Sequence, residues 1–184
     1  MKILYFSPHP NIGLHVQSGP GTHIREVINA FRQEGHEVET LVMGQSSSAG
    51  ASETAEENDG SRGGLKQKIK PFVPKYLWQS LKDRNLLKFD RFAKQELIQK
   101  IQEFQPDLIY ERGYYMMTSG VEAAKEMGVK HCLEMNAPYP EEKLEMEGKG
   151  IYDRKAAQKE RQQVMSGQSK RISIETDHVR QILL

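Results

Sequence analysis

The sequence contains almost no cysteine, which excludes a fold that is held together by disulfides. Cys132 is the only thiol among 184 residues, so no disulfide can form within the chain. A reducing compartment fits this composition. Because Cys132 stands inside an apolar run, we expect it to be a small buried hydrophobic side chain rather than a reactive thiol.

Long hydrophobic runs and an excess of one charge are absent as well. No stretch approaches the roughly 20 apolar residues that a membrane-spanning helix needs, and the first apolar run, residues 3–6, is too short for a signal peptide. The 26 basic and 25 acidic residues give a formal charge of +1, so nothing favours nucleic acid as a partner. We therefore expect a cytoplasmic protein with one domain.

Short apolar runs alternate with stretches of helical periodicity along the chain. Strands are predicted at residues 3–6, 38–43, 107–111, 129–134 and 171–175. Helices are predicted from an N-cap at Thr22 to a left-handed glycine at Gly35, and over residues 89–104, 115–127 and 152–166. This alternation predicts an α/β fold, a Rossmann-like parallel sheet flanked by helices. Ligands of such sheets bind beyond the carboxyl ends of the strands.

Two neighbouring segments do not fit the alternation. Residues 45–64 are rich in Ser, Ala, Gly and Glu, with almost nothing to bury, and we interpret them as a flexible insertion. Residues 65–88 are basic and aromatic, and within them Lys66–Trp78 interleaves four lysines with apolar and aromatic side chains. Two hypotheses stay open for this part: contact with anionic headgroups at the inner face of a membrane, or a lid that packs on the sheet or on another domain.

The glycine-rich stretch 18–31, SGPGTHIREVINAF, opens the first predicted helix with Gly19 and Gly21. It is not a dinucleotide-binding fingerprint, because Ile24 stands where the third glycine belongs and the turn comes about a dozen residues late. It is not a P-loop either, because G-x-x-x-x-G-K-[ST] does not occur. Backbone N–H groups at a helix start favour a phosphate. The alternative is a plain loop that leads into the helix.

His9 raises one further alternative. Zinc-dependent deacetylases of small sugars carry Pro-His-Pro-Asp-Asp after the first strand, and this sequence has Asn11 and Ile12 in place of the two aspartates. Both a metal ligand and the base of the hydrolysis are then missing. We expect no metal site.

Four segments resemble, in order, the N-terminal domain of family 4 glycosyltransferases, which share the two-domain GT-B fold. The resemblance covers nearly the whole chain apart from residues 45–88, and it includes the turn Gly35-His36-Glu37-Val38 before the second strand. The four segments are Gly19–Val42, Pro106–Val129, Leu133–Glu142 and Lys170–Leu184.

The resemblance implies that residues 1–184 form the acceptor-side domain of a retaining glycosyltransferase of the hexosyltransferase type. Its substrates would be a nucleotide-sugar and a carbohydrate or lipid-linked acceptor, with no cofactor and no metal, and no Asp-x-Asp motif occurs. The family's donor-binding domain, which carries an E-x7-E pair, is expected to be absent, so this chain alone would be inactive. Glu134 and Glu142 have that spacing, but the family's pair lies in the other domain.

The resemblance also assigns roles to residues at the start of the first predicted helix and at the end of the third predicted strand. Gly19, Gly21 and His23 would approach the donor's phosphates, although His23 could also be a capping or solvent-facing residue. Glu111 and Arg112, at the end of the third predicted strand, would lie beside the reacting sugar. Arg112 suits acceptor hydroxyls or phosphate because its planar guanidinium carries several donors. A plain ion pair is the alternative for both residues.

The acceptor would also meet residues that follow the fourth and fifth predicted strands. Asn136 and Glu142 are acceptor-side candidates, and Thr176 and Asp177 are weaker ones that could simply cap a helix. Two other functions stay open. One is a stand-alone Rossmann-like module that binds a nucleotide or sugar, and the other is one chain of a split glycosyltransferase.

Overall fold

The computed structural model describes residues 1–46, 74–135, 143, 145, 151–165 and 169–172. Its strands are β1 (Lys2–Ser7), β2 (Glu37–Val42), β3 (Leu108–Arg112), β4 (Lys130–Glu134) and β5 (Ser169–Ile172). Its helices are α1 (Gly19–Gln33), α2 (Met43–Ser46), α4 (Lys75–Phe104), α5 (Ser119–Met127) and α7 (Asp153–Met165).

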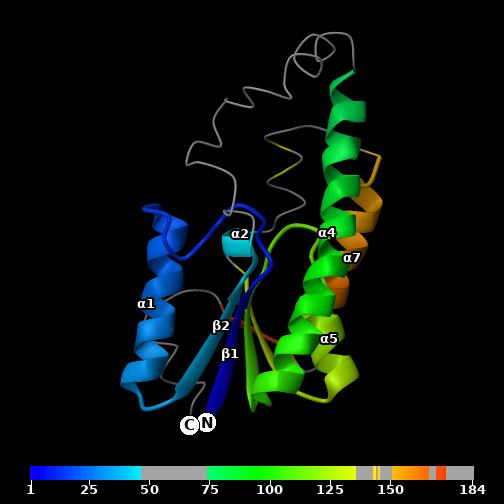
Figure 1. Cartoon of the computed structure of the whole chain (residues 1–184). Helices are drawn as coiled ribbons and strands as arrows, with labels where there is room; N and C mark the ends of the chain where they lie inside the picture. Colours follow the sequence, from blue (N-terminus) through cyan, green and yellow to red (C-terminus); the bar gives the residue numbers. More distant parts are fainter. Residues whose placement is uncertain (47–73, 136–142, 144, 146–150, 166–168, 173–184) are drawn as a thin grey trace.

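The strands form one parallel sheet in the order β2-β1-β3-β4-β5. Helix α1 covers one face, and α4, α5 and α7 lie on the other (Figure 1). The sequence of connections therefore reverses direction between β1 and β3, and this switch point is where ligands of open α/β sheets bind. The Rossmann-like parallel fold that the sequence predicts is confirmed.

Strand β1 is the centre of the core, and its side chains alternate between the two faces of the sheet. Ile3 and Tyr5 pack under α1, while Leu4 and Phe6 pack under α4 and α5. All four are fully buried, as expected of a strand that is covered on both sides. Cys132 in β4 is 3% exposed, which confirms that it is a buried side chain.

Helix α1 begins three residues before the predicted N-cap at Thr22, which is therefore wrong. Ser18 is the N-cap, and its Oγ accepts a hydrogen bond of 3.2 Å from the backbone N–H of Gly21. Serine at this position satisfies an N–H group that the helix itself leaves unpaired. Gly19 and Gly21 thus lie inside the first turn rather than in a loop before it. Gly35 follows the helix at φ +82°, as predicted.

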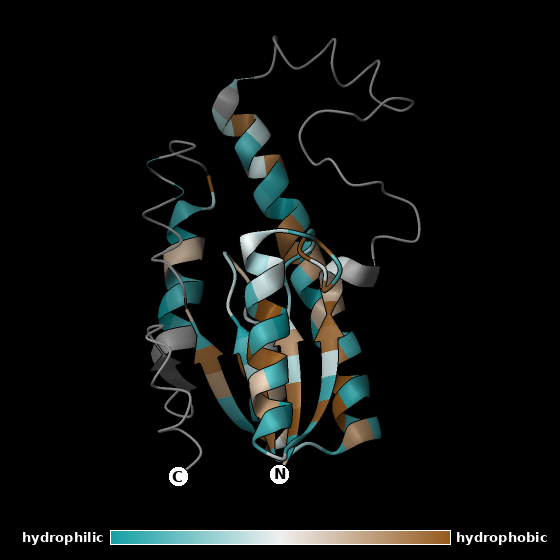
Figure 2. Cartoon of the chain, turned by 90° about the vertical axis from the view of Figure 1, so that its left-hand side faces the viewer, coloured by the Kyte–Doolittle hydropathy of each residue, from teal (hydrophilic) through white to brown (hydrophobic). Residues whose placement is uncertain are grey.

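Helix α4 is the longest of the described helices and begins at Lys75, so the predicted start at residue 89 is wrong. Two buried aspartates, Asp83 and Asp90, interrupt its apolar pattern, and each is paired with a lysine from elsewhere in the chain. The helix extends well beyond the carboxyl ends of the strands (Figures 1 and 2). Residues 75–88 of the basic, aromatic segment are thus helical, whereas residues 65–73 and nearly all of the predicted insertion lie outside the described residues.

Helix α5 also begins later than predicted, at Ser119 instead of residue 115. Met116 takes a left-handed backbone conformation at φ +61°, which interrupts helical geometry ahead of the N-cap Thr118. Gly128 ends the helix at φ +68°, as predicted. Of the predicted fifth strand, 171–175, the first two residues belong to β5 and the others lie outside the described residues.

Candidate functional site

Charged and aromatic side chains meet beyond the carboxyl ends of β3 and β4, beside the first turn of α1. Tyr110 and Arg112 are two positions apart in β3 and point to the same face of the sheet, the face that α1 covers. Glu134 ends the neighbouring strand, where it pairs with Arg112 in register. His23 reaches the same point from α1. We call Tyr110, Arg112, Glu134 and His23 the Glu134 network.

Glu134 is the centre of this network. Its side chain is completely buried, and its Oε1 lies 2.9 Å from Nε2 of His23 and 3.3 Å from Nη1 of Arg112. The hydroxyl of Tyr110 donates to Oε2 at 3.1 Å. Three donors, one from α1 and two from β3, therefore share one carboxylate of β4, and they tie these three elements together at the carboxyl ends of the strands.

The donors around Glu134 keep its carboxylate ionised. Burial alone would raise the pKa of Glu134, but the hydrogen bonds from His23 and Tyr110 and the charges of His23 and Arg112 lower it below its usual value. An ionised carboxylate only accepts hydrogen bonds, so Nε2 of His23 carries the proton that it shares. Burial and the negative charge of Glu134 raise the pKa of Tyr110, so its phenol stays protonated and donates.

His9 lies near Arg112, in the loop between β1 and α1. Its ring packs on Tyr114 with a centroid distance of 4.0 Å, and the N–H of Asn11 donates to its Nδ1 at 3.0 Å. Burial and the nearby charge of Arg112 lower the pKa of His9 to about 4. The imidazole is thus neutral at pH 7 and adds no second positive charge. The described residues contain no cluster of three side chains that could hold a metal ion.

Gly19 and Gly21 occupy very different surroundings in the first turn of α1. A Cβ atom at Gly21 would overlap the backbone oxygen of Val16, whereas one at Gly19 would meet nothing within 4 Å. The guanidinium of Arg25 holds the same loop, with hydrogen bonds of 2.6 Å to the oxygen of Leu14 and 3.2 Å to that of Val16. Gly21 therefore serves the packing of the loop against the helix, and Gly19 faces open space.

Glu111 is not part of the Glu134 network, although it is adjacent to Arg112 in the sequence. Strand alternation sends its side chain to the opposite face of the sheet, where it is fully buried. Its Oε2 lies 2.7 Å from Nε2 of His131, and it packs against Gly120 in the first turn of α5. The structure thus brings together His23 and Arg112 but separates Glu111 from both. Asn136, Glu142, Thr176 and Asp177 lie outside the described residues.

Sequence reasoning missed Glu134 as a member of the site. It considered this residue only for its spacing to Glu142, and it pointed to the residues after the fourth strand rather than to the last residue within it. An acidic residue at the buried end of a parallel strand was the available signal, since such a group needs partners to be stable there. Tyr110 was missed too, because a tyrosine in an apolar strand looks like a core residue.

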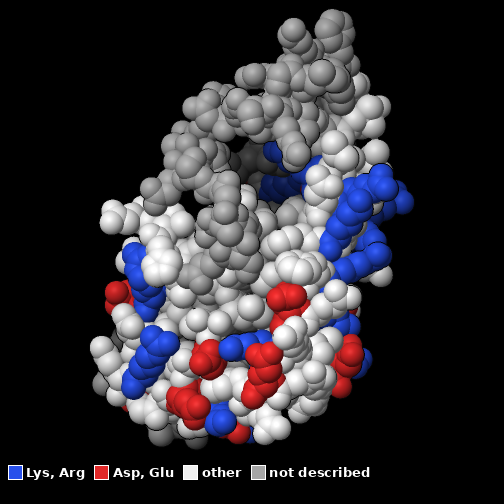
Figure 3. Space-filling view, viewed as in Figure 1, with Lys and Arg blue, Asp and Glu red and all other residues white. Residues whose placement is uncertain are grey.

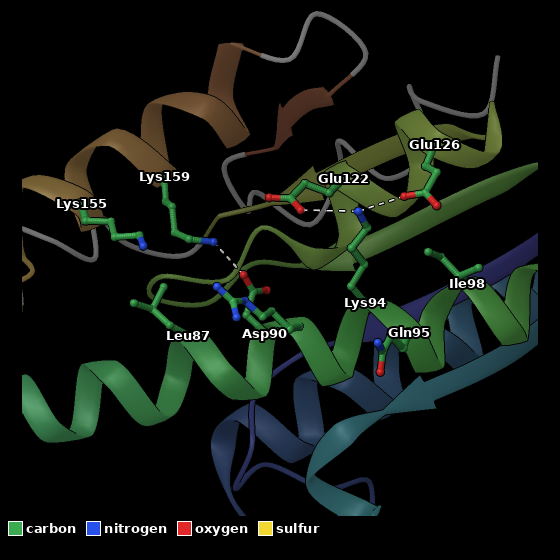
Figure 4. A pocket seen from close by; sticks show the side chains of 10 residues that line it. Leu87, Asp90, Lys94, Gln95, Ile98, Glu122, Glu126, Lys155 and Lys159 are labelled. Atoms are coloured by element: carbon green, nitrogen blue, oxygen red, sulfur yellow. Dashed lines mark hydrogen bonds and ion pairs between the residues drawn. The ribbon is translucent and has the colours of Figure 1, made fainter.

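A polar pocket of about 600 Å³ lies elsewhere, between α4, α5 and α7 (Figure 4). It contains no member of the Glu134 network. Two of its lysines are paired with acids of the same pocket: Lys159 binds Asp90 at 2.7 Å, and Lys94 binds Glu126 at 2.9 Å. The lining residues are Leu87, Asp90, Arg91, Lys94, Gln95, Ile98, Glu122, Glu126, Lys155 and Lys159.

The sheet, its switch point and the charged cluster above it define a Rossmann-like domain of the kind that binds nucleotides and sugars. Residues 17–184 match the profile of Glycosyltransferase Family 4. The chain belongs to this family, which confirms the resemblance drawn from the sequence. Membership implies a glycosyltransferase with a nucleotide-sugar donor and an acceptor. No curated protein and no solved structure matches the chain significantly.

Proposed function

We propose that this chain is the acceptor-side domain of a retaining glycosyltransferase that transfers a hexose from a nucleotide-sugar. The observation that carries this proposal is the Glu134 network, because it places a guanidinium and an imidazole together at the switch point of the sheet. Its charges suit a reaction in which a diphosphate leaves and negative charge develops. The family match supports the class of reaction.

Arg112 is the residue that we propose to touch the substrates. It is 14% exposed and uses Nη1 for Glu134, and its planar guanidinium carries further donors that suit sugar hydroxyls or a phosphate. His23 and Gly19 would approach the donor's phosphates from the start of α1, with Gly21 holding the loop beneath them. Glu134 would orient Arg112 and His23. Asn136 and Glu142, on the chain that follows β4, would bind the acceptor.

Our assignment of Glu111 to catalysis stays a prediction, and its surroundings favour an indirect role. Its carboxylate is completely buried against His131 and Gly120, so it would act by fixing the end of β3 and hence the position of Arg112. Replacement by glutamine in the active enzyme would then lower stability together with turnover. A loss of turnover at unchanged stability would instead support direct participation.

We propose that a donor-binding domain completes the site and that the present chain binds nucleotide weakly without it. Inactivity of the isolated chain follows from this proposal, because the family's main donor contacts lie in that domain. The completing domain could belong to a partner chain, as in a split enzyme. The stand-alone binding module is the alternative function, and it predicts tight nucleotide binding by this chain alone.

Two hypotheses stay open for Lys66–Trp78: contact with a membrane surface, and packing as a lid. Residues 66–73 lie outside the described residues, and Tyr76 and Trp78 belong to the first turn of α4. No described helix is both long enough and apolar enough to cross a bilayer. Contact with a membrane surface and packing as a lid both stay proposals for this segment.

Calorimetric titration of the chain with UDP, GDP and a UDP-sugar tests the proposal. Two variants probe the site: Gly19→Val, which adds bulk in open space, and Arg112→Gln, which removes the charge that Glu134 faces. Arg161→Gln on α7 is the matched control, because it removes the same charge away from the strand ends. We expect millimolar or absent binding in the wild-type chain. A trace of binding should weaken in the first two variants and persist in the control.

Micromolar binding to the wild-type chain would overturn the acceptor-side proposal. If Gly19→Val and Arg112→Gln then abolish it, this domain holds a nucleotide by itself and is a binding module. If neither variant changes it, the nucleotide binds elsewhere and the Glu134 network is not a phosphate site.

A further inference from the structure

One side of α4 is exposed, basic and apolar at the same time. Exposed positions recur at intervals of three and four residues from Leu77 to Phe92, which places them on one side of the helix. We call this side the outer stripe of α4. Its members are Leu77, Leu81, Arg84, Lys88, Arg91 and Phe92.

The apolar members of the outer stripe are large side chains that water surrounds. Leu77 is 41% exposed, Leu81 48% and Phe92 45%, and the adjacent Tyr76 is 51% exposed. Single exposed apolar residues are ordinary on protein surfaces. Several exposed apolar side chains along one side of a helix form a contiguous patch, and such patches mark surfaces that bind a partner.

The charge of this side of the helix has one sign. Every charged residue at an exposed position between residues 76 and 95 is Lys or Arg, and no acidic side chain is exposed there. The acids of this part of the helix, Asp83 and Asp90, are buried on its inner side, where they bind Lys143 and Lys159 at 2.7 Å each. Both acids are neutralised within the fold, and no described acidic side chain forms an ion pair with Arg84, Lys88 or Arg91 of the outer stripe.

The arrangement in space also suits a flat partner. The helix lies at one side of the molecule (Figure 1) and extends beyond the sheet (Figure 2), and Lys and Arg gather on that side, over α4 and α7 (Figure 3). The stripe from Leu77 to Phe92 covers 16 residues, or roughly 24 Å of helix.

We propose that the outer stripe of α4 docks on the surface of an anionic lipid bilayer. The apolar side chains enter the boundary between headgroups and acyl chains, while the aliphatic stems of Arg84, Lys88 and Arg91 lie beside them and their cations meet lipid phosphates. A nucleic acid would match the cations but not the exposed leucines. This inference stands apart from the proposed glycosyl transfer, and it places the contact on the described helix rather than on residues 66–73.

The single tryptophan of the chain makes the proposal measurable. Trp78 lies in the first turn of α4, next to Leu77, so its emission should shift to shorter wavelength when the stripe enters a bilayer. The experiment mixes the chain with vesicles of phosphatidylcholine alone, or with about one third phosphatidylglycerol to give a negative surface potential. Sedimentation of the vesicles gives the bound fraction independently of fluorescence.

We expect binding to the anionic vesicles only, and binding should weaken as salt is added. Arg84→Glu with Lys88→Glu should reduce the partition coefficient at least about tenfold, since each basic side chain contributes roughly 1 kcal/mol near such a surface. Leu77→Ser with Leu81→Ser should also reduce it. The control, Lys125→Glu with Lys130→Glu, makes the same charge change at exposed positions away from α4 and should bind like the wild type.

Three results would overturn the proposal. The chain could fail to bind anionic vesicles, it could bind neutral vesicles equally well, or the control could lose as much affinity as the α4 variant. If no vesicle binds but the chain dimerises, and Leu77→Ser with Leu81→Ser prevents this, the stripe contacts a second copy instead. Circular dichroism of each variant verifies that these surface substitutions leave the fold intact.

Discussion

His23 and Glu134 are 111 residues apart in the sequence and are joined by a hydrogen bond of 2.9 Å. The contact links the first turn of α1 to the last residue of β4, and Arg112 and Tyr110 complete the same cluster. A buried carboxylate is unfavourable unless its lone pairs are satisfied, and here three side chains satisfy them. We propose that the same donors meet the substrates of the glycosyltransferase.

Replacing Glu134 by glutamine should destabilise the protein, although size and shape are nearly kept. Arg112 loses its anionic partner, and the buried amide cannot accept from every donor that the carboxylate served. The free energy of unfolding should fall by about 2–4 kcal/mol, as measured by urea denaturation at pH 7. Glu26→Gln, at an exposed position of α1, should stay within about 0.5 kcal/mol of the wild type. Equal stability of the two variants would contradict the role of the network.

Alanine should have opposite consequences at the two glycines of α1. At Gly21 the new Cβ overlaps the oxygen of Val16, which Arg25 holds in place, so we expect a loss of about 1–3 kcal/mol. At Gly19 the Cβ enters open space, and the change should stay within about 0.5 kcal/mol. Thermal or urea unfolding measures both. If Gly21→Ala is as stable as Gly19→Ala, the loop does not depend on this close approach.

Stability should decline with acidification between pH 6.5 and about 4 because of His9. Burial and Arg112 lower the pKa of His9 from 6.5 to about 4, so the unfolded chain binds more protons in that window and gains stability relative to the fold. The full stability is present above pH 6.5. The loss is at most about 3 kcal/mol, and less because the ring is partly exposed.

A comparison of variants isolates this contribution. Urea denaturation as a function of pH should give a shallower slope for His9→Asn, even though the loss of ring packing on Tyr114 lowers its stability at every pH. His15→Asn, at an exposed position of the same loop, should keep the slope of the wild type. An unchanged slope in His9→Asn would show that other groups cause the acid sensitivity.

Asp90 and Lys159 should be energetically coupled, because they join three helices. Oδ1 of Asp90 accepts from the backbone N–H groups of Thr118 and Ser119 at 3.0 and 2.9 Å, and Oδ2 binds Lys159 at 2.7 Å. A side chain of α4 therefore caps α5 and holds α7. Asp90→Asn should lower the free energy of unfolding by about 2–4 kcal/mol.

A double-mutant cycle with Lys159→Met measures the coupling. We expect an interaction energy of about 0.5–3 kcal/mol between the two positions. Additive effects within error would mean that Lys159 contributes nothing to the capping arrangement.

Helix starts show why parts of the fold could not be predicted. The apolar face of α1 was visible in the sequence, but Thr22 and Ser18 are both suitable caps, and only the backbone hydrogen bond of Gly21 distinguishes them. In α4 the side that packs on the fold carries Asp83 and Asp90, so the periodic signal began only near residue 89. Lysines from distant segments make these buried acids tolerable, and a local pattern contains no information about them.

The sequence by itself determined the parallel sheet and the family, and it predicted a site at the strand ends with Arg112 and His23. Continuous apolar runs and left-handed glycines are local properties, and they suffice for those conclusions. Only the tertiary structure decided which side chains meet. Register and strand alternation bring Glu134 to Arg112 and His23 while sending Glu111 to the opposite face. Such contacts depend on how distant strands pair, because a shift of one residue exchanges the two faces of a strand.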